Sequence, residues 1–284
     1  MAGRLTAADL DAGLQSLTSA TAADVDKWLA ELKERKNEVG RRVCNDKQYE
    51  AVLLVARRVQ QELFAASDPA ADFGEPVRWL LHGAPGTGKS HVVKQELFTE
   101  VLKWDIGVQF QVVALQAVMA DLLGGDTIHH ACVIPVMQKK GGEAAHQQRH
   151  MDIAKKVLQW RWLIIDEISM VSARLFAHID VKLRNVVREI GTAKVGADRR
   201  DRPIGGLNVL CGGDLWQLDP PDGGFLGDIP AEFIRRARQY IRGPTVSHGQ
   251  SLMWGGGEHG IQGVTELEER LRGTFEARNT MIHM

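Results

Sequence analysis

The chain has 284 residues, of which 44% are hydrophobic and 25% charged, and its formal net charge at pH 7 is -1. These proportions are typical of a soluble globular protein with one large domain or two small ones. So small a net charge gives no global electrostatic reason to expect nucleic acid or an anionic membrane as partner, although a local basic face is compatible with it. The first thirty residues are acidic and lack an apolar core, and no long apolar stretch follows, so we expect neither secretion nor a membrane span.

The three cysteines, Cys44, Cys132 and Cys211, lie far apart in the sequence and show no C-x-x-C spacing. They cannot all pair within one chain, which favours free thiols in a reducing compartment, cytosolic or nuclear.

Two helices are predicted in the first quarter of the chain. Residues 21–38 carry apolar side chains at helical spacing; Thr21 is placed to cap the N-terminus, and Asp24 adds acid to the first turn. A second helical pattern runs from Asp46 to about Ala66. Both patterns are typical of packing helices.

Short apolar runs then alternate with helical segments, which predicts a parallel sheet flanked by helices. The runs are VRWLLHG, FQVVA, RWLIIDE and LNVLCGGD. Helices are expected from Lys89 to Trp104 and from Ser172 to Ile190, and polar loops at QKKGGEAAHQQ and GTAKVGADRRDRPIGG. The strand-forming part is expected to close at about Gly224, followed by one helical candidate, AEFIRRARQYIR, and an irregular glycine-rich tail.

The stretch GAPGTGKS satisfies the P-loop pattern G-x-x-x-x-G-K-[ST], with a predicted strand before it and a helix after it. Small residues let successive backbone N–H groups converge on phosphate oxygens at a helix N-terminus. Lys89 is expected to neutralise the β and γ phosphates of a nucleotide, and Ser90 to ligate magnesium. The predicted nucleotide-binding set is Gly83, Ala84, Pro85, Gly86, Thr87, Gly88, Lys89, Ser90 and His91.

A second motif, RWLIIDEIS, ends a predicted buried strand in two carboxylates. Asp166 is expected to hold magnesium, and Glu167 to orient and deprotonate an attacking water, if this strand lies beside the phosphate loop. Without the P-loop, the same pattern would fit a surface strand end about as well.

A third motif, LNVLCGGDLWQLDPP, places Asp214 and Gln217 after another predicted strand. A polar side chain here can contact the γ phosphate and respond to its loss. The alternative is a Gly-Asp turn followed by a proline stop.

Together these motifs resemble the Pif/RecD-like branch of superfamily 1 DNA helicases, the petite integration frequency helicases and their relatives in Helitron transposons. GAPGTGKS is similar to that branch's motif I, IIDEISMV (Ile164 to Val171) to its motif II, and CGGDLWQLDPP to its motif III. The resemblance runs from about Asp46 to Gln217. It implies a RecA-like fold, ATP and Mg2+ as cofactors, and movement along single-stranded or forked DNA in the 5'-to-3' direction.

The resemblance also implies roles for more isolated residues. In LLGGDTIHHA, Thr127 and His129 match a segment that contacts single-stranded DNA, whereas a satisfied histidine at a helix start is the alternative for His129. In NDKQYEAV, Gln48 matches the glutamine that binds the adenine edge, against the alternative of a solvated side chain. Residues 115–120 depart from the family's P-T-G-x-A-A pattern at the Pro, Thr and Gly.

In VTELEERLRG, Arg272 matches an arginine that approaches the γ phosphate, with Arg270 as the second choice and an exposed Glu/Arg-rich helix as the alternative. We therefore expect an N-terminal helical extension (1–44), a RecA-like ATP-binding domain (45–228), and a tail (229–284) that begins a second RecA-like domain. With that second domain missing, the 284 residues are expected to bind ATP and Mg2+, to hydrolyse slowly and not to translocate.

The function predicted is the ATPase domain of a DNA helicase in repair, recombination, telomere maintenance or transposition, in the nucleus or another DNA-containing compartment. A basic groove for DNA could include Lys139, Lys140, Arg149, Lys155 and Lys156, although such a run is more often a solvated face. The alternatives are another P-loop ATPase acting on protein, and a nucleotide-binding scaffold that has lost catalysis. The oligomeric state stays open.

Overall fold

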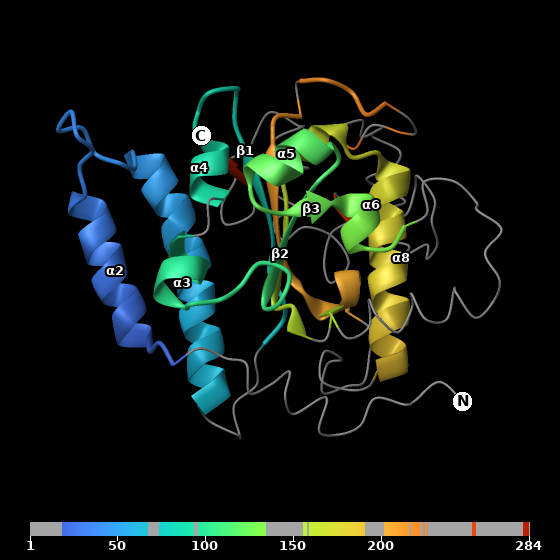
Figure 1. Cartoon of the computed structure of the whole chain (residues 1–284), viewed down its shortest axis with the longest axis horizontal. Coiled ribbons are helices and arrows are strands. Elements are labelled where there is room, and N and C mark those ends of the chain that lie inside the picture. Colours follow the sequence, from blue (N-terminus) through green and yellow to red (C-terminus); the bar gives the residue numbers. More distant parts are fainter. Residues whose placement is uncertain are drawn as a thin grey trace, which may run out of the picture.

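A six-stranded, all-parallel sheet forms the centre of the molecule, in the order β3-β2-β4-β5-β1-β6 (Figure 1). The computed structural model describes residues 19–67, 74–93, 96–134, 156–157, 159–190, 202–215, 217–221, 224, 226, 252–253 and 281–283. The strands are β1 Arg78–His82, β2 Phe110–Ala114, β3 Asp126–Thr127, β4 Trp162–Ile165, β5 Asn208–Gly213 and β6 Met281–His283.

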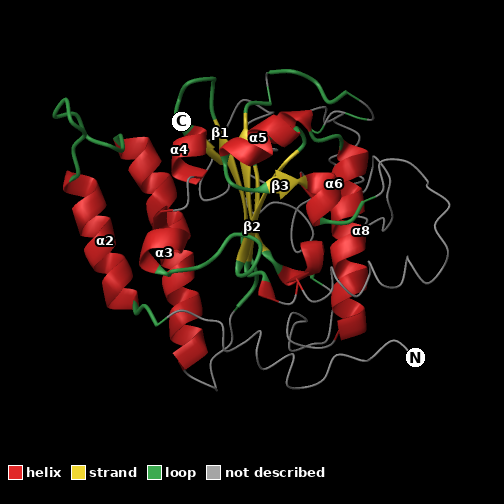
Figure 2. Cartoon of the chain, viewed as in Figure 1, coloured by secondary structure: helices red, strands yellow, loops and turns green. Residues whose placement is uncertain are grey.

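Helices cover both faces of this sheet, which gives a three-layer α/β fold (Figure 2). One face is covered by α2 and α3, and the other by α6 and α8. The helical elements are α2 Ala22–Glu34, α3 Asp46–Ser67, α4 Lys89–Val93, the π-helix Leu97–Val101, α5 Ala117–Leu122, α6 Ile128–Ala131, the 3-10 turn Ile168–Met170, α8 Ala173–Ile190 and the 3-10 turn Pro203–Gly206.

The four predicted strands are confirmed, but the sheet extends beyond them. The expectation that strand formation closes at about Gly224 is wrong, because β6 at Met281–His283 pairs in parallel with β1. Such a three-residue strand carries too short a pattern to be distinguished from loop sequence. The predicted helix from Lys89 to Trp104 is described in two parts, α4 up to Val93 and a π-helix over Leu97–Val101, and it ends three residues before the predicted end.

The first helix begins as predicted and ends earlier. Thr21 accepts a hydrogen bond from the Asp24 backbone N–H at 3.3 Å, while the Asp24 side chain accepts one from the Thr21 backbone at 2.8 Å. This capping box satisfies two backbone donors that a helix N-terminus otherwise exposes. The helix ends at Glu34, four residues before the predicted end, where Arg35 adopts an extended conformation.

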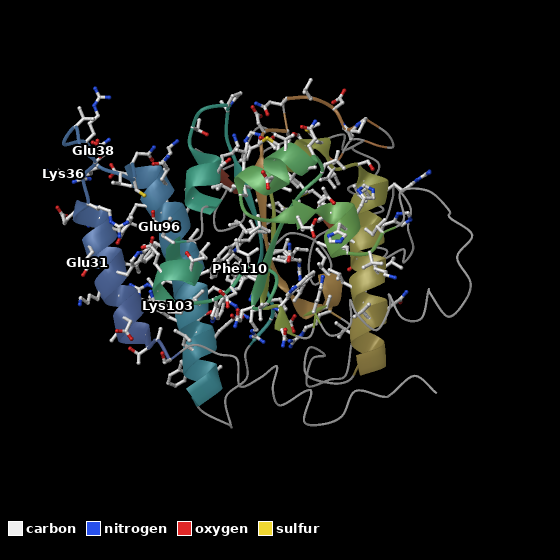
Figure 3. All side chains as sticks on the ribbon, in the orientation of Figure 1. Glu31, Lys36, Glu38, Glu96, Lys103 and Phe110 are labelled. Carbon is white, nitrogen blue, oxygen red and sulfur yellow. The ribbon has the colours of Figure 1, made fainter. Side chains whose placement is uncertain are left out.

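The two faces of the sheet are packed with different side chains. The α2/α3 face is rich in aromatic residues, where Phe98 contacts Trp104, Phe110 and Trp162 with ring centroids 5.6, 5.0 and 5.5 Å apart. The α6/α8 face is packed mainly with aliphatic side chains. Figure 3 shows Phe110 in the interior, whereas Glu31, Lys36 and Glu38 project at the α2 side of the molecule.

Buried charge closes the amino edge of the sheet, where β4 and β5 begin. Glu62 of α3 is 1% exposed; its Oε1 accepts from Arg58 Nη2 at 3.3 Å and Asn208 Nδ2 at 2.6 Å, and it forms an ion pair with Arg161 Nη2 at 3.2 Å. Asn208 Oδ1 in turn accepts from Arg58 Nε and from the Val77 backbone N–H, both at 3.1 Å. These contacts tie α3 to the starts of three strands.

All three cysteines are buried free thiols, as predicted. Burial raises the pKa of Cys132 and of Cys211 to about 12, so neither thiol is ionised at neutral pH. Among the described residues, no helix combines the length and apolar character that a membrane span requires.

Candidate nucleotide-binding site

The predicted motifs meet at the carboxyl edge of the sheet. GAPGTGKS follows β1, DEIS follows β4 and GGD ends β5, and the carboxyl ends of parallel strands lie along one edge. The sequence prediction depends on β4 and β1 being neighbours; instead β5 lies between them. The motifs nevertheless touch, because Ser90 Oγ donates to Asp166 Oδ2 at 3.4 Å.

Lys89, the first residue of α4, folds its side chain back against the phosphate loop. Its side chain is buried at 8% exposure, and Nζ donates to the Gly83 carbonyl at 2.6 Å and the Ala84 carbonyl at 3.0 Å. Gly86 and Gly88 adopt φ values of 75° and 84°, a left-handed conformation that glycine takes without steric cost. The loop therefore wraps around its own ammonium group at the start of α4.

Asp166 is a carboxylate buried at the end of β4. It is 1% exposed, and its Oδ1 has no hydrogen-bond partner. Burial raises the pKa of Asp166, and hydrogen bonds from the Glu167 backbone and from Ser90, with the charge of Lys89, oppose the rise. An inward-facing carboxylate oxygen beside a serine hydroxyl suits a hard, oxygen-binding cation such as Mg2+.

Glu167 follows in a strained backbone conformation. Its φ of 52° and ψ of 49° are left-handed, which is uncommon for a residue other than glycine and is concentrated at functional sites. Burial raises the pKa of Glu167, the neighbouring Asp166 raises it further, and Lys89 lowers it. The described residues contain no group of three side chains able to hold a metal by themselves.

Motif III is attached to the phosphate loop by a residue that the sequence prediction missed. His82, the last residue of β1, places Nε2 3.5 Å from Asp214 Oδ1, and both side chains are buried. The Gly83 N–H also donates to the Gly213 carbonyl at 3.3 Å. The only sequence signal was a polar residue ending an otherwise apolar strand immediately before the glycines.

Gly213 lets motif III approach motif II. A Cβ on Gly213 would lie 2.9 Å from both the backbone N and Cγ2 of Ile168, the residue after Glu167. Gln217 is half-buried, and its backbone N–H donates to the Asp214 carbonyl at 3.0 Å. Motifs I, II and III therefore form one contiguous region.

Gln48 also reaches the phosphate loop, but through the loop's backbone. Its Nε2 donates to the Thr87 carbonyl at 3.0 Å, and its Oε1 accepts from the Asn45 backbone N–H at 2.9 Å. Asn45 Oδ1 accepts from the Gln48 N–H at 2.9 Å, which completes reciprocal capping of α3. The alternative of a solvated glutamine is wrong, and contact with adenine stays a prediction.

The segment predicted to contact DNA lies at the β3 edge of the sheet. Thr127 caps α6, since its side chain accepts from the His130 N–H at 3.3 Å, and His129 lies half-buried in the first turn. His130 Nδ1 contacts Asp126 Oδ2. Residues 115–120 depart from the family pattern, and helix α5 begins within them, at Ala117, with Gln116 at its N-cap.

Several predicted residues lie outside the described part of the chain. These are Arg272, Arg270, Lys139, Lys140, Arg149, Lys155 and the side chain of His91. Lys156 is described and exposed.

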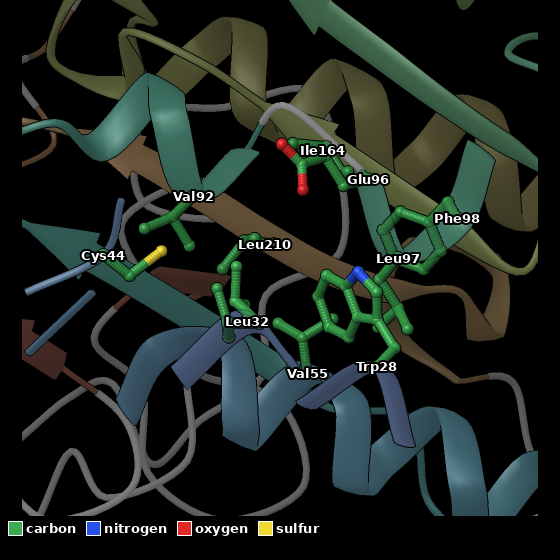
Figure 4. Close-up of a pocket in the computed structure, with 11 residues that line it drawn as sticks. Trp28, Leu32, Cys44, Val55, Val92, Glu96, Leu97, Phe98, Ile164 and Leu210 are labelled. Carbon is green, nitrogen blue, oxygen red and sulfur yellow. The ribbon is translucent and has the colours of Figure 1, made fainter. Parts of the chain in front are cut away.

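A separate apolar pocket lies between α2, α3, α4 and the sheet (Figure 4). Trp28 of α2, Val55 of α3 and Val92 of α4 line it, with Ile164 and Leu210 from the strands. None of the predicted nucleotide-binding residues lines this pocket. This apolar hollow is therefore distinct from the site that the motifs define.

The parallel sheet, the glycine loop around Lys89 and the carboxylates after β4 define an α/β P-loop protein of RecA-like fold. The model of the PIF1-like helicase family matches residues 58–222, and the chain belongs to that family. The matched range spans motifs I to III.

Individual relatives agree with this assignment. Human ATP-dependent DNA helicase PIF1 is 26% identical over 172 residues, which make up 61% of this chain and 24% of that protein. ATP-dependent DNA helicase RRM3 of Saccharomyces cerevisiae is 30% identical over 142 residues, 49% of this chain and 18% of that protein. The chain thus spans less than a quarter of the length of these two relatives.

Solved structures of Pif1 helicases are also similar. The crystal structure of Bacteroides Pif1 bound to ssDNA is 26% identical, with a TM-score of 0.42, and covers 63% of this chain and 34% of its own. The crystal structure of Pif1 helicase from Candida albicans is 18% identical, with a TM-score of 0.45, and covers 85% of this chain and 40% of its own.

Proposed function

We propose that the chain is the ATP-binding and ATP-hydrolysing part of a 5'-to-3' DNA helicase. The observation that carries this proposal is the convergence of Lys89, Ser90, Asp166 and Glu167 at one edge of a parallel sheet, in a member of the PIF1-like family. Curated relatives in that family are named ATP-dependent DNA helicases.

In this proposal Lys89 exchanges the Gly83 and Ala84 carbonyls for the β and γ phosphates of ATP. The loop's backbone N–H groups hold the same phosphates. Ser90 and Asp166 would hold the magnesium ion, which supplies positive charge against the phosphates and orients them. Cation binding would also compensate the Asp166 charge, whose burial is unfavourable without a partner.

Glu167 is the proposed general base for the attacking water. A pKa raised by burial strengthens a carboxylate as a proton acceptor, and half-burial leaves it within reach of water. Asp214 and Gln217 are proposed to respond to the γ phosphate, because they follow β5 beside both the phosphate loop and the Glu167 turn. Arg272 is proposed as the arginine that approaches the same phosphate.

We propose contact with single-stranded DNA through Thr127 and His129, and adenine contact through Gln48. The proposed organisation is a helical extension (1–44), the ATP-binding domain (45–228) and a tail (229–284) that leads to a second RecA-like domain. The proposed setting is intracellular DNA maintenance: repair, recombination, telomere maintenance or transposition.

The test compares the ATPase rate with and without oligo-dT for wild type and Glu167→Gln. The glutamine variant should bind a fluorescent ATP analogue with unchanged affinity and lose turnover, while Glu50→Gln on the exposed face of α3 should behave as wild type. Equal rates for wild type and Glu167→Gln would refute the role of Glu167. ATP binding without any DNA stimulation would instead favour the nucleotide-binding scaffold.

A further inference from the structure

Ser169 follows the two carboxylates of motif II, and its hydroxyl is buried without a partner. The side chain is 1% exposed, and Oγ makes no hydrogen bond within the described part of the chain. Asp166 Oδ1, three residues earlier, is also unpaired, but a magnesium ion is the proposed ligand for that oxygen. A buried hydroxyl without a hydrogen bond is unfavourable, and native structures contain few of them. The roles proposed for Asp166 and Glu167 give no reason for this one.

The turn that carries Ser169 is also strained. Glu167, immediately before the 3-10 turn Ile168–Met170, has a φ of 52° and a ψ of 49°. Outside glycine, this left-handed conformation is unfavourable and persists only where the surrounding contacts hold it. The Met170 N–H donates to the Glu167 carbonyl at 3.0 Å, so the strained residue and the turn are joined directly. Two unfavourable features therefore lie within three residues of motif II.

The end of β5 presses against the same turn. A Cβ on Gly213 would lie 2.9 Å from the Ile168 backbone N and 3.4 Å from the Ser169 backbone N, so only glycine allows the two backbones this approach. The Gly213 carbonyl also accepts from the Gly83 N–H of the phosphate loop at 3.3 Å. Because packed interiors do not compress freely, a shift at the end of β5 must displace the turn that carries Ser169.

We propose that Ser169 is a positioning residue that acts through Glu167. Its hydroxyl is unpaired without nucleotide and hydrogen-bonds a polar group of motif III once a γ phosphate is bound. This inference rests on the proposed function, in which Asp214 and Gln217 of motif III respond to that phosphate. A serine hydroxyl both donates and accepts, so a carboxylate and an amide are both suitable partners. The new bond would hold the Glu167 turn against motif III with ATP bound but not with ADP.

The first test measures stability without nucleotide, by urea unfolding followed by circular dichroism. Ser169→Ala removes an unpaired buried hydroxyl, so its midpoint should move to higher urea. Ser172→Ala is the matched control, because Ser172 is 3% exposed and its Oγ accepts from the Leu175 N–H at 3.2 Å at the start of α8. Loss of this cap should move the midpoint to lower urea. An unchanged or lowered midpoint in Ser169→Ala would overturn the proposal, since the hydroxyl would then be satisfied without nucleotide.

The second test measures nucleotide affinity by calorimetry in the presence of Mg2+. Ser169→Ala should bind adenylyl imidodiphosphate, a non-hydrolysable ATP analogue, about 2- to 10-fold more weakly than the wild type, which corresponds to one lost hydrogen bond. Its affinity for ADP should be unchanged, and Ser172→Ala should bind both nucleotides as the wild type does. Unchanged affinity of Ser169→Ala for the analogue would overturn the proposal. Equal weakening for the analogue and ADP would also overturn it, because the effect would not depend on the γ phosphate.

A double-mutant cycle tests the link between Ser169 and motif III. If the two act as a unit, the losses in analogue affinity from Ser169→Ala and Gln217→Ala should be less than additive in free energy. Strictly additive losses would overturn the pairing of Ser169 with motif III and leave the proposed function standing. Wild-type affinity of Gln217→Ala for the analogue would instead overturn the proposed γ-phosphate response, and the role of Ser169 with it.

Discussion

The two edges of the central sheet both bury charge, but with opposite balances. At the amino edge, Arg58 and Arg161 surround one carboxylate, Glu62, whose Oε1 accepts two hydrogen bonds and pairs with Arg161. At the carboxyl edge, Asp166, Glu167 and Asp214 lie around one ammonium, Lys89, which donates to loop carbonyls.

This difference separates charge that holds the fold from charge that is available for a ligand. The amino-edge groups join α3 to the strand starts; burial lowers the pKa of Arg58, and the charge and hydrogen bond of Glu62 oppose that fall. At the carboxyl edge, burial raises the pKa of both Asp166 and Glu167, which means that their charged forms are poorly stabilised. A magnesium ion and a nucleotide would supply the missing compensation.

Removing the amino-edge carboxylate should have the largest effect on stability. Glu62→Gln removes the carboxylate that faces the buried guanidinium of Arg58 and the partly buried one of Arg161, and breaking a buried pair costs about 3 to 5 kcal/mol. Urea unfolding followed by circular dichroism measures this loss. Glu50→Gln, on the exposed face of the same helix, should change the free energy of unfolding little. Equal small losses in both variants would contradict the structural role of Glu62.

The same type of substitution at the carboxyl edge should have the opposite sign. Asp166→Asn removes an under-compensated buried charge, so the ligand-free variant should be more stable than the wild type at pH 7. It should also lose magnesium-dependent binding of a fluorescent ATP analogue. Unfolding is measured with a chelator present, so that no divalent cation contributes.

The gain from Asp166→Asn should depend on pH. Because the folded pKa of Asp166 is raised above its unfolded value, ionisation makes the wild type less stable as pH rises from the unfolded pKa through the folded one. The free-energy gap between variant and wild type should therefore be larger at pH 7 than at pH 4. A gap that grows toward acid pH would contradict this.

The His82 and Asp214 contact should have a smaller effect, confined to coupling between motifs I and III. A double-mutant cycle of His82→Gln and Asp214→Asn should give a coupling free energy of about 1 kcal/mol in binding of the ATP analogue. Strictly additive losses would show that the 3.5 Å contact does not link the phosphate loop to motif III.

An exposed ion pair should have the smallest effect. Arg57 Nη1 and Asp26 Oδ1 are 3.0 Å apart, but both side chains are more than half exposed. Arg57→Gln should therefore lower the free energy of unfolding by less than about 1 kcal/mol. A loss as large as that of Glu62→Gln would remove the distinction between buried and exposed charge on α3.

The sequence predicted much of the fold because its patterns were local. The runs that became β1, β2, β4 and β5 were recognisable from apolar residues and their breaks, and Thr21 and Asp24 cap α2 as expected. It failed where pairing with a distant segment decided the outcome, as at β6, and it did not predict the π-helix over Leu97–Val101.

The sequence alone determined the phosphate loop, the acidic strand end and motif III, since each is a short pattern whose chemistry follows from its residue types. Only the tertiary structure decided how they meet. In the folded chain β5 lies between the strands that carry motifs I and II, His82 contacts Asp214, and α8 packs beside α6. The physical reason is that strand order and helix packing depend on contacts between residues far apart in the chain, which no local pattern records.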